Sequence, residues 1–400
     1  MKILVITERL PSKIGGGAAR QLNLIKHLAH RHEFTLASFS SPQDAHRIEE
    51  IRPYLKRVEI VWMPERQLPV RSRLYWQLNA WSHSLFTPYP RRGRFKEAQE
   101  MCDMVGRLHA HHHFDIVQVH QAYLAETLPS RITAKKVLDM HDVLSDYEHR
   151  AMEAVSRPSH RFHAWMEWQK MRVYERRQVR KFDHCLIVSE TDHLSLLKLA
   201  PDVRATVIPN GVDTEYFRPV GCPTDGKNIV FVGSMNFQPN IEAVLWFYRS
   251  ILPLIRDRIP KVHFTIVGWQ PPQEIIDLGD DPAITVTGTV DDVRPYIDEA
   301  AIFVVPLRLG SGTRLKILDA WSMGKAVVST SVGAEGLPVQ SEENILLADD
   351  AGTFASAVVR LLDDGPLRER LGKNGRELVL AQYAWDTIVD RLNSVYSSLA

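Results

Sequence analysis

The sequence predicts an α/β protein with two doubly wound domains in tandem, each a parallel sheet covered by helices. Its 400 residues are more than one ordinary hydrophobic core organises. Short apolar runs rich in valine and isoleucine alternate with helical patterns, which is typical of parallel strands buried on both faces. A stretch rich in proline and glycine, 217–227, indicates the joint between the two domains.

The first half contains seven predicted strands. Each is a short apolar run bounded by polar or turn residues, and they span 2–7, 34–39, 58–63, 114–120, 135–140, 184–189 and 205–209. A helix is predicted over 19–31, because Leu22, Ile25 and Leu28 recur at helical spacing on one face.

The second half repeats this pattern with six further runs. They span 228–234, 262–268, 283–288, 301–306, 326–330 and 344–348. A largely buried helix is predicted from an N-cap at Thr313 to Met323, with Gly324 as the glycine that ends it. The last segment, 383–400, is predicted to form one amphipathic helix.

Composition and charge narrow the class of protein. Hydrophobic residues make up 44% of the chain, but no apolar stretch approaches the roughly 20 residues that span a bilayer. The opening segment 1–10 resembles a strand more than a signal peptide. Three widely spaced cysteines, Cys102, Cys185 and Cys222, are expected to be free thiols, so we expect a cytoplasmic protein.

The charge is divided unevenly between the two halves. The net charge of +1 comprises +9 over 1–190 and −8 over 191–400. The basic half either carries a surface for an anionic membrane or acidic ligand, or is simply solvated. It contains no nucleic-acid recognition motif, so we expect no nucleic-acid partner.

Ligands of open α/β sheets bind where strands end and helices begin, so turns after strands hold the candidate site residues. Glycines 15–17 precede the first helix and allow close approach by a ligand. They do not form the dinucleotide fingerprint, because Arg20 stands where its third glycine belongs. A flexible loop is the alternative interpretation.

The start of the predicted helix after 301–306 carries two cations, Arg314 and Lys316. Cations are unfavourable at a helix N-terminus unless an anion lies in front of them. We therefore expect these side chains and the turn Ser311, Gly312 and Thr313 to hold a diphosphate, with Asp319 accepting hydrogen bonds from sugar hydroxyls. The alternative is an ordinary i, i+3 ion pair between Lys316 and Asp319.

Further polar or glycine residues follow other strands. His120 ends the run 114–120 and is a candidate catalytic residue. His141 and Asp142 follow the run 135–140 and are expected on the acceptor side; a structural role is the alternative for either histidine. In the second half the residues at strand ends are Gly233, Asn236, Thr287, Thr289 and Val290. Each is a weak indication of a ligand site by itself.

Several of these segments together resemble a known family. The segments 209–219, 286–306, 316–330 and 333–337 are similar in order and spacing to the GT-B-fold retaining glycosyltransferases of family four. The run PNIEAVLWF, 239–247, with the segment G-S-G-T-R-L-K, further resembles the exopolysaccharide-type sugar transferases.

The resemblance implies two Rossmann-like domains facing an interdomain cleft. The acceptor would bind the domain 1–219, to which the helix 383–400 returns, and a nucleotide diphosphate sugar would bind the domain 227–382. The implied reaction retains the sugar's configuration and needs no metal or cofactor; the chain has no D-x-D pair.

The family also implies roles for individual residues. Gly16 or Gly17 would approach the donor phosphates, and His120 would lie beside the reacting sugar. Asp319 would hold the ribose, while backbone near the residues noted at 287–290 would contact the nucleobase.

The chain departs from the family pattern at four positions. Ser311 replaces a glutamate that contacts the donor sugar, and Asp319 is one methylene shorter than the family's second glutamate. Ser234 stands where an arginine is common, and Asn240 stands near the usual lysine. We infer that Arg314 and Lys316 supply the missing cations.

The acceptor is predicted to be a saccharide or a lipid-linked saccharide. Segments 71–95 and 161–182 mix arginines with aromatic residues and could lie on the cytoplasmic face of an anionic membrane, or could pack over the first domain. The alternative functions are a nucleotide-sugar epimerase of GT-B architecture and a non-catalytic glycan-binding relative.

Overall fold

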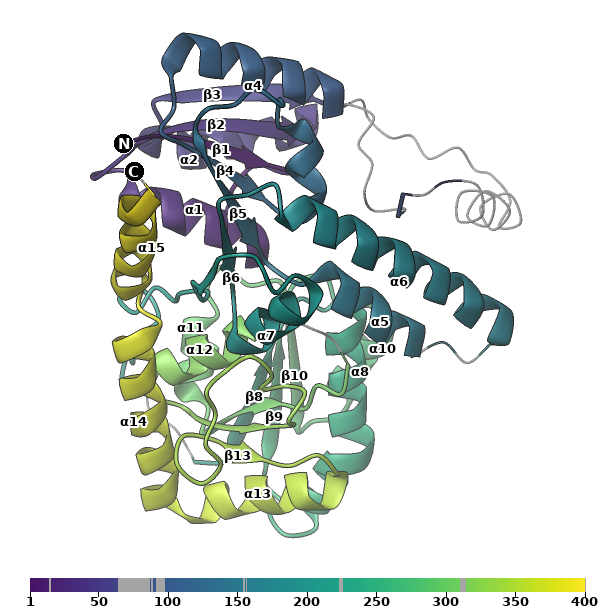
Figure 1. The fold of residues 1–400 in the computed structure, drawn as a ribbon. Coiled ribbons are helices and arrows are strands. Elements are labelled where there is room, and N and C mark those ends of the chain that lie inside the picture. The colour runs from purple at the N-terminus through teal and green to yellow at the C-terminus, as the bar shows by residue number, and fades with distance from the viewer. Residues whose placement is uncertain are drawn as a thin grey trace. The chain divides into compact units, whose positions relative to one another are not determined.

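The computed structural model describes residues 1–13, 16–63, 87, 89–90, 98–153, 155, 157–222, 226–309 and 314–399. These residues form two compact units (Figure 1). The first comprises Met1–Pro209 with Val389–Ala400, and the second comprises Asn210–Ile388. The chain therefore leaves the first unit at Pro209, before the boundary at 219 that the sequence suggested.

The first unit is built on a parallel sheet whose seven described strands have the order β3-β2-β1-β4-β5-β6-β7. The strands are β1 (Lys2–Thr7), β2 (Glu33–Ser40), β3 (Arg57–Trp62), β4 (Ile116–His120), β5 (Lys135–Met140), β6 (His184–Ile187) and β7 (Ala205–Val207). The helices are α1 (Gly16–Leu28), α2 (Ile48–Ile51), α4 (Ala98–His112), α5 (Leu144–Glu153), α6 (Pro158–Val179) and α7 (Glu190–Leu199). All seven predicted strands of this half are confirmed.

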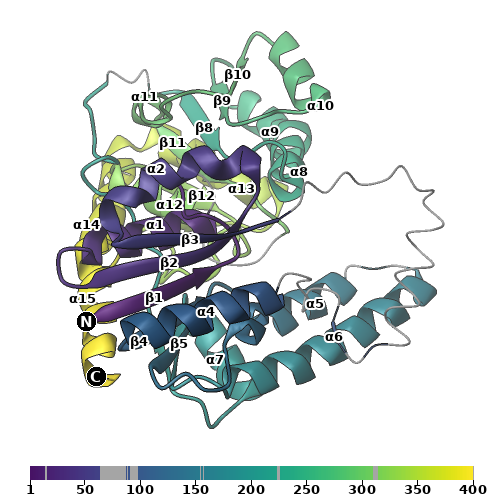
Figure 2. The ribbon, with the colours of Figure 1, turned by 90° about the horizontal axis from the view of Figure 1, so that it is seen from above.

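Helices cover the sheet because their apolar faces have the expected spacing. Leu22, Ile25 and Leu28 of α1 are at most 4% exposed, as predicted. The apolar side chains of β1, β4 and β5 form one core with α4. Figure 2 shows α5 and α6 lying side by side as an elongated helical pair at one end of the unit.

The N-terminus of α5 is capped by a buried acid from α6. The Glu175 carboxylate accepts hydrogen bonds from the backbone N–H groups of Leu144 (2.8 Å) and Ser145 (3.0 Å). These are two of the donors that a helix N-terminus leaves unsatisfied. Burial nevertheless raises the pKa of Glu175 to about 7. The cap fixes the start of α5, which begins two residues after Asp142.

The second unit contains a parallel sheet of six described strands in the order β10-β9-β8-β11-β12-β13. The strands are β8 (Asn228–Val232), β9 (His263–Val267), β10 (Ile284–Gly288), β11 (Ile302–Val305), β12 (Ala326–Ser329) and β13 (Leu346–Leu347). The helices are α8 (Gln238–Trp246), α9 (Leu252–Arg256), α10 (Gln273–Ile276), α11 (Arg294–Glu299), α12 (Leu315–Ser322), α13 (Ala351–Asp363), α14 (Gly365–Gln382) and α15 (Trp385–Leu399). From Val389 onward α15 belongs to the first unit.

Helix α12 begins later than the sequence indicates. Its first residue is Leu315, so Arg314 takes the N-cap position, and no side chain caps the helix. The predicted N-cap, Thr313, lies outside the described residues. The other end agrees with prediction, because Gly324 has a φ of +69° that favours glycine. Trp321 is fully buried, as expected for a helix that is apolar nearly all round.

None of the helices among the described residues combines the length and apolar character needed to cross a bilayer. The three cysteines are free thiols, as predicted.

Candidate active site

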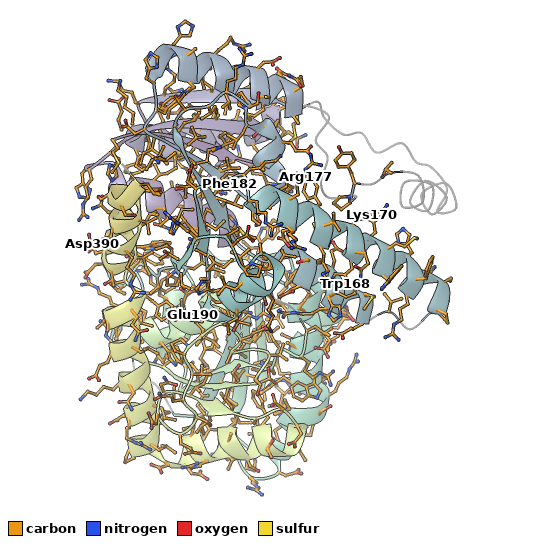
Figure 3. All side chains as sticks on the ribbon, in the orientation of Figure 1. Trp168, Lys170, Arg177, Phe182, Glu190 and Asp390 are labelled. Atoms are coloured by element: carbon orange, nitrogen blue, oxygen red, sulfur yellow. The ribbon has the colours of Figure 1, made fainter. Side chains whose placement is uncertain are left out.

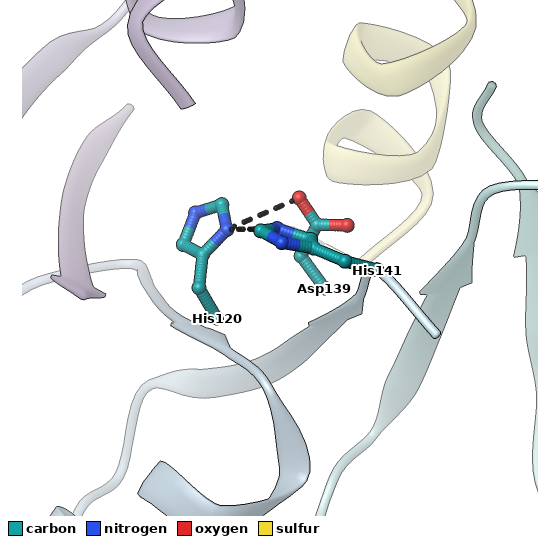
Figure 4. Close-up of side chains that lie close together, drawn as sticks. All are labelled: His120, Asp139 and His141. Atoms are coloured by element: carbon teal, nitrogen blue, oxygen red, sulfur yellow. Dashed lines mark hydrogen bonds and ion pairs between the residues drawn. The ribbon is translucent and has the colours of Figure 1, made fainter. Parts of the chain in front are cut away.

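A buried polar cluster lies at the carboxyl ends of β4 and β5 in the first unit. The register of the two strands places His120 opposite Asp139, so both side chains project from the same face of the sheet. Gln118 lies two residues before His120 and shares that face. His141 follows β5 directly, and Figure 4 shows His120, Asp139 and His141 gathered together.

Arg20 and Asp139 form the charged centre of this cluster. Arg20 lies on α1, and its Nε and Nη2 atoms donate to both carboxylate oxygens of Asp139 at 3.0–3.2 Å. Its Nη1 donates to the carbonyl oxygen of Pro209 at 2.9 Å. The two side chains are 1% and 0% exposed. Burial opposes ionisation, but the charge of Arg20 holds the pKa of Asp139 at about 2.

The two histidines of the cluster are neutral near pH 7. Nδ1 of His120 lies 3.2 Å from Nε2 of His141 and 3.3 Å from Oδ2 of Asp139. Burial is the largest influence and lowers the pKa of His120 to about 3, although the charge of Asp139 opposes it. Burial likewise lowers the pKa of His141 to about 4.

The opposite side of the His141 ring lies against the first turn of α1. A Cβ placed on Gly17 would come within 2.7 Å of Nδ1 of His141. Position 17 therefore requires glycine, because real Cβ atoms do not approach so closely. The structure thus brings together two predicted site elements, the glycine turn at Gly16 and Gly17 and the pair His120 and His141. Asp142 follows, half-buried.

The donor atoms of His120, Asp139 and His141 lie within 4.8 Å of one another, a spacing that a metal ion could bridge. Arg20, however, already occupies both carboxylate oxygens of Asp139. The set therefore fits a neutralised ion pair with two neutral imidazoles better than a metal centre.

In the second unit, Lys316 of α12 reaches the carboxyl end of β8. Its Nζ donates to Oδ1 of Asn240 at 2.9 Å and lies 4.2 Å from the centre of the Phe231 ring. A Cβ on Gly233 would be 2.8 Å from this Nζ, so the missing side chain makes room for the ammonium group. Lys316 therefore binds Asn240 and does not form the ion pair with Asp319 that was the alternative interpretation.

Burial and neighbouring charge shift the titration of the α12 residues. Burial, with the charge of Arg314, lowers the pKa of Lys316, and burial raises that of Asp319. Nε and Nη2 of Arg314 are themselves buried. Two cations thus lie close together at the start of α12, a place that favours an anionic ligand.

The remaining predicted residues lie where strands of the second unit end. Oγ of Ser234 donates to Oδ1 of Asn236 at 2.9 Å. Thr287 donates to the carbonyl of Gly288, Thr289 accepts from the N–H of Gln270, and Val290 packs against the core. Ser311, Gly312 and Thr313, with Gly15, lie outside the described residues.

Sequence reasoning missed several members of the first-unit cluster: Arg20, Gln118, Asp139 and Tyr396. Arg20 could have been found as a charged residue within the apolar stripe of its helix. Asp139 could have been found as an acid inside the apolar run KKVLDM. Gln118 donates through Nε2 to Nε2 of His120 at 3.1 Å, and its Oε1 accepts a short hydrogen bond from the hydroxyl of Tyr396 on α15. No local pattern links a tyrosine near the C-terminus to the fourth strand.

Two family models together match most of the chain. The model described as Glycosyltransferase Family 4 matches residues 14–216, and the one described as Glycosyl transferases group 1 matches residues 226–364. Among curated proteins, the chain is 29% identical over 170 residues to the lipopolysaccharide core biosynthesis glycosyltransferase LpsE of Rhizobium meliloti, covering 40% of this chain and 45% of that one. It is 26% identical to an Escherichia coli UDP-Gal:alpha-D-GlcNAc-diphosphoundecaprenol alpha-1,3-galactosyltransferase. That match covers 48% of this chain and 54% of the relative. These matches span about half the length of each relative.

Solved structures share the fold over the full length. The sucrose-phosphate synthase of Thermosynechococcus elongatus superposes with a TM-score of 0.72 at 19% identity, covering 100% of this chain and 99% of that one. The Anabaena protein HepE in complex with UDP gives a TM-score of 0.69 at 14% identity, covering both chains completely. The predicted fold, two Rossmann-like units of the GT-B class, is confirmed.

Proposed function

The chain belongs to glycosyltransferase family 4, and we propose that it moves a sugar from a nucleotide diphosphate sugar to a saccharide or lipid-linked saccharide acceptor. The named relatives support this: LpsE builds lipopolysaccharide core, and the Escherichia coli relative uses a UDP-sugar and a diphosphoundecaprenol-linked acceptor. We propose a place in surface or exopolysaccharide synthesis.

The position of Lys316 is the observation that carries the proposal. Its ammonium lies at the carboxyl end of β8, beside Gly233, where open α/β sheets bind ligands. Arg314 adds a second cation at the start of α12. This is the charge that the family pattern places after the first strand of this domain and that Ser234 and Asn240 lack. We propose that these two cations bind the donor diphosphate.

The chemistry follows from the charge that develops on that diphosphate. The bond between the anomeric carbon and the phosphate oxygen breaks, and its electron pair stays on the diphosphate. Fixed cations stabilise this charge more than they stabilise the ground state, and one such group contributes about 3 kcal/mol to lowering the barrier. Asp319 would hold the ribose, and backbone near Thr287 and Thr289 the nucleobase.

Retention follows in this proposal from attack on the same face. The acceptor oxygen bonds to the anomeric carbon from the side that the diphosphate leaves, and a phosphate oxygen takes the acceptor proton. The two side-chain cations neutralise the diphosphate charge that a metal ion would otherwise neutralise, so we propose a metal-independent reaction. The first unit contributes the glycine turn and the pair His120 and His141 on the side of the reacting sugar.

We further propose that α6 rests on an anionic membrane face and brings a lipid-linked acceptor within reach. Its residues Phe162, Trp165 and Val173 are 52%, 44% and 71% exposed. They share one helical face with Arg161 and Arg172, which are also exposed. Figure 3 shows side chains of α6, among them Lys170 and Arg177. The segment 71–95 lies almost entirely outside the described residues.

A flotation assay tests the membrane contact. We expect the protein to float with vesicles containing anionic phospholipid at low salt, and a Phe162→Ser, Trp165→Ser variant to remain at the bottom. Equal flotation with purely zwitterionic vesicles, or unchanged flotation of the variant, would contradict it.

A thermal-shift screen against nucleoside diphosphates and their sugars tests the main proposal. We expect one base to stabilise the protein by mass action, and the paired variant Arg314→Ala, Lys316→Ala to lose that shift. A shift that survives in the variant would refute the assignment of these cations.

A further inference from the structure

One face of α8 in the second unit bears a groove. Gln238, Glu242, Leu245 and Trp246 recur there at helical spacing, and Arg308, which follows β11, completes the lining. The groove has a volume of about 370 Å³, which lies within the range of small-molecule sites. None of these residues belongs to the donor-binding set proposed above, so the groove is a separate feature of this unit.

The run PNIEAVLWF, 239–247, is divided between two faces of α8. Asn240 accepts the hydrogen bond from Lys316. Glu242 and Trp246, one helical turn apart, line the groove instead. The run therefore builds a second feature besides the partner of Lys316.

A π-helical turn, Phe247–Ile251, follows α8 directly and interrupts the regular helix beside the groove. Pro253, in the first turn of α9, has no N–H group to give the carbonyl of Arg249 four residues earlier. Arg249 and Ser250, both within the π-helical turn, also line the groove. Such turns are rare and occur frequently at functional sites, so this one supports a ligand-binding role for the groove.

The carboxylate of Glu242 has only one of its oxygens satisfied. Nε and Nη2 of Arg308 both donate to Oε1, the first at 2.9 Å. The guanidinium group of Arg308 also lies 4.6 Å from the centre of the Trp246 ring, a cation–π contact that orients it. Oε2 of Glu242 is buried and has no hydrogen-bond partner among the described residues. A buried acceptor without a donor is costly, and a ligand can supply that donor.

The charged groups of the groove restrict the chemistry of this ligand. The side chain of Glu242 is 22% exposed and its terminal torsion is soft, so Oε2 can turn toward the groove. The ligand must donate a hydrogen bond to this oxygen, which a carboxylate or a fully ionised phosphate cannot do. Arg249 and Arg308 repel a cation but donate to an oxygen. A hydroxyl group meets both requirements, because it donates and accepts.

We propose that the groove on α8 binds a hexopyranose unit of a saccharide chain, with a hydroxyl that donates to Oε2 of Glu242 and accepts from Arg249. Leu245 and Trp246, both half-buried, supply apolar surface for the C–H groups of the ring. The site takes no part in the transfer chemistry. The choice of a saccharide, among ligands rich in hydroxyl groups, rests on the proposed function.

Hydrogen exchange of the full chain, measured by mass spectrometry, tests the site. The probes are tetrasaccharides of glucose, galactose, mannose and N-acetylglucosamine, with inorganic phosphate as the comparison anion. We expect at least one tetrasaccharide to slow exchange over residues 241–251. Unchanged exchange in this segment with all four tetrasaccharides, or slowing by phosphate alone, would overturn the proposal.

Two variants and a matched control identify the residues that bind the saccharide. Glu242→Gln keeps an amide oxygen for Arg308 and places an NH2 group where Oε2 was, so we expect about tenfold weaker binding in calorimetry. Arg249→Ala changes an exposed residue and should also weaken binding. Arg258→Ala removes the same charge from an exposed position outside the groove and should not. Equal affinities in all three variants would contradict the assignment.

A transferase assay separates this site from the proposed function. Because Arg249 lies outside the donor-binding residues, Arg249→Ala should retain the thermal shift caused by the nucleoside diphosphate. Saccharide binding that is lost in Arg249→Ala, in a protein without any transferase activity, would refute the proposed function and leave the groove site intact. Transferase activity without any saccharide effect on residues 241–251 would refute the groove site alone.

Discussion

Replacing Arg20 by methionine should destabilise the first unit strongly. The substitution keeps most of the side-chain volume but leaves the Asp139 carboxylate, 0% exposed, without its cation. Removing one partner of a buried ion pair costs about 3–5 kcal/mol. The lowered pKa of Asp139, about 2 against 3.8, independently corresponds to about 2.5 kcal/mol of stabilisation.

The pH dependence of this effect has a defined sign. In the native protein the pKa of Asp139 is depressed, so its contribution is present above pH 4 and is lost as the pH falls toward 2. In Arg20→Met burial dominates and raises this pKa. The loss of stability in Arg20→Met, relative to the native protein, should therefore be largest at neutral pH. It should shrink as the pH is lowered and Asp139 becomes protonated.

Hydrogen exchange measured by mass spectrometry is the suitable assay, because a protein with two units need not unfold in one transition. At pH 7 we expect amides of β4 and β5 to exchange about 10²- to 10⁴-fold faster in Arg20→Met, after correction for intrinsic rates. Arg180→Met is the control in the same unit, since its partner Asp202 is 60% exposed. Equal exchange in the two variants, or a deficit that does not shrink at lower pH, would refute the reasoning.

Three further predictions concern other parts of the molecule. Ionisation of Glu175 penalises the folded state as the pH rises from 4.5 to 7, by about 3 kcal/mol at most, so Glu175→Gln should flatten the curve of stability against pH over that window; an unchanged slope would contradict this. Gly233→Ala places a Cβ 2.8 Å from Nζ of Lys316 and should weaken nucleoside diphosphate binding in calorimetry by tenfold or more, whereas Gly106→Ala, with only an ordinary 3.5 Å contact, should not. Asp319→Asn should weaken binding of the nucleotide by about 1.5–3 kcal/mol, the contribution of a hydrogen bond to a charged group, and equal affinities in calorimetry would exclude the ribose contact.

Much of the fold could be predicted from the sequence because strand burial in parallel sheets leaves continuous apolar runs. Residues 2–7 and 135–140 form strands with the predicted bounds. The glycine turn and the cations of α12 could also be found from the sequence. Three successive glycines before a helix, and two cations at a helix N-terminus, are both unusual. Gly324 was recognised as a helix end because only a few residues tolerate its backbone conformation.

The remaining parts of the site depend on contacts between residues far apart in the sequence. Tyr396 lies 278 residues from Gln118, and nothing in the neighbourhood of either indicates the hydrogen bond between them. Asn240, noted only as a departure from the family, turns out to be the partner of Lys316, 76 residues away. The start of α12 was misplaced because Arg314, a poor capping residue, takes the N-cap position there.

The central claim is that the second unit binds a diphosphate through the cations at the start of α12. Calorimetric titration with the diphosphate and the monophosphate of the preferred nucleoside tests it most directly. We predict that the diphosphate binds the native protein at least tenfold more tightly, and that Lys316→Ala abolishes most of this difference while leaving monophosphate affinity nearly unchanged. Equal affinities for the two nucleotides in the native protein would contradict the account.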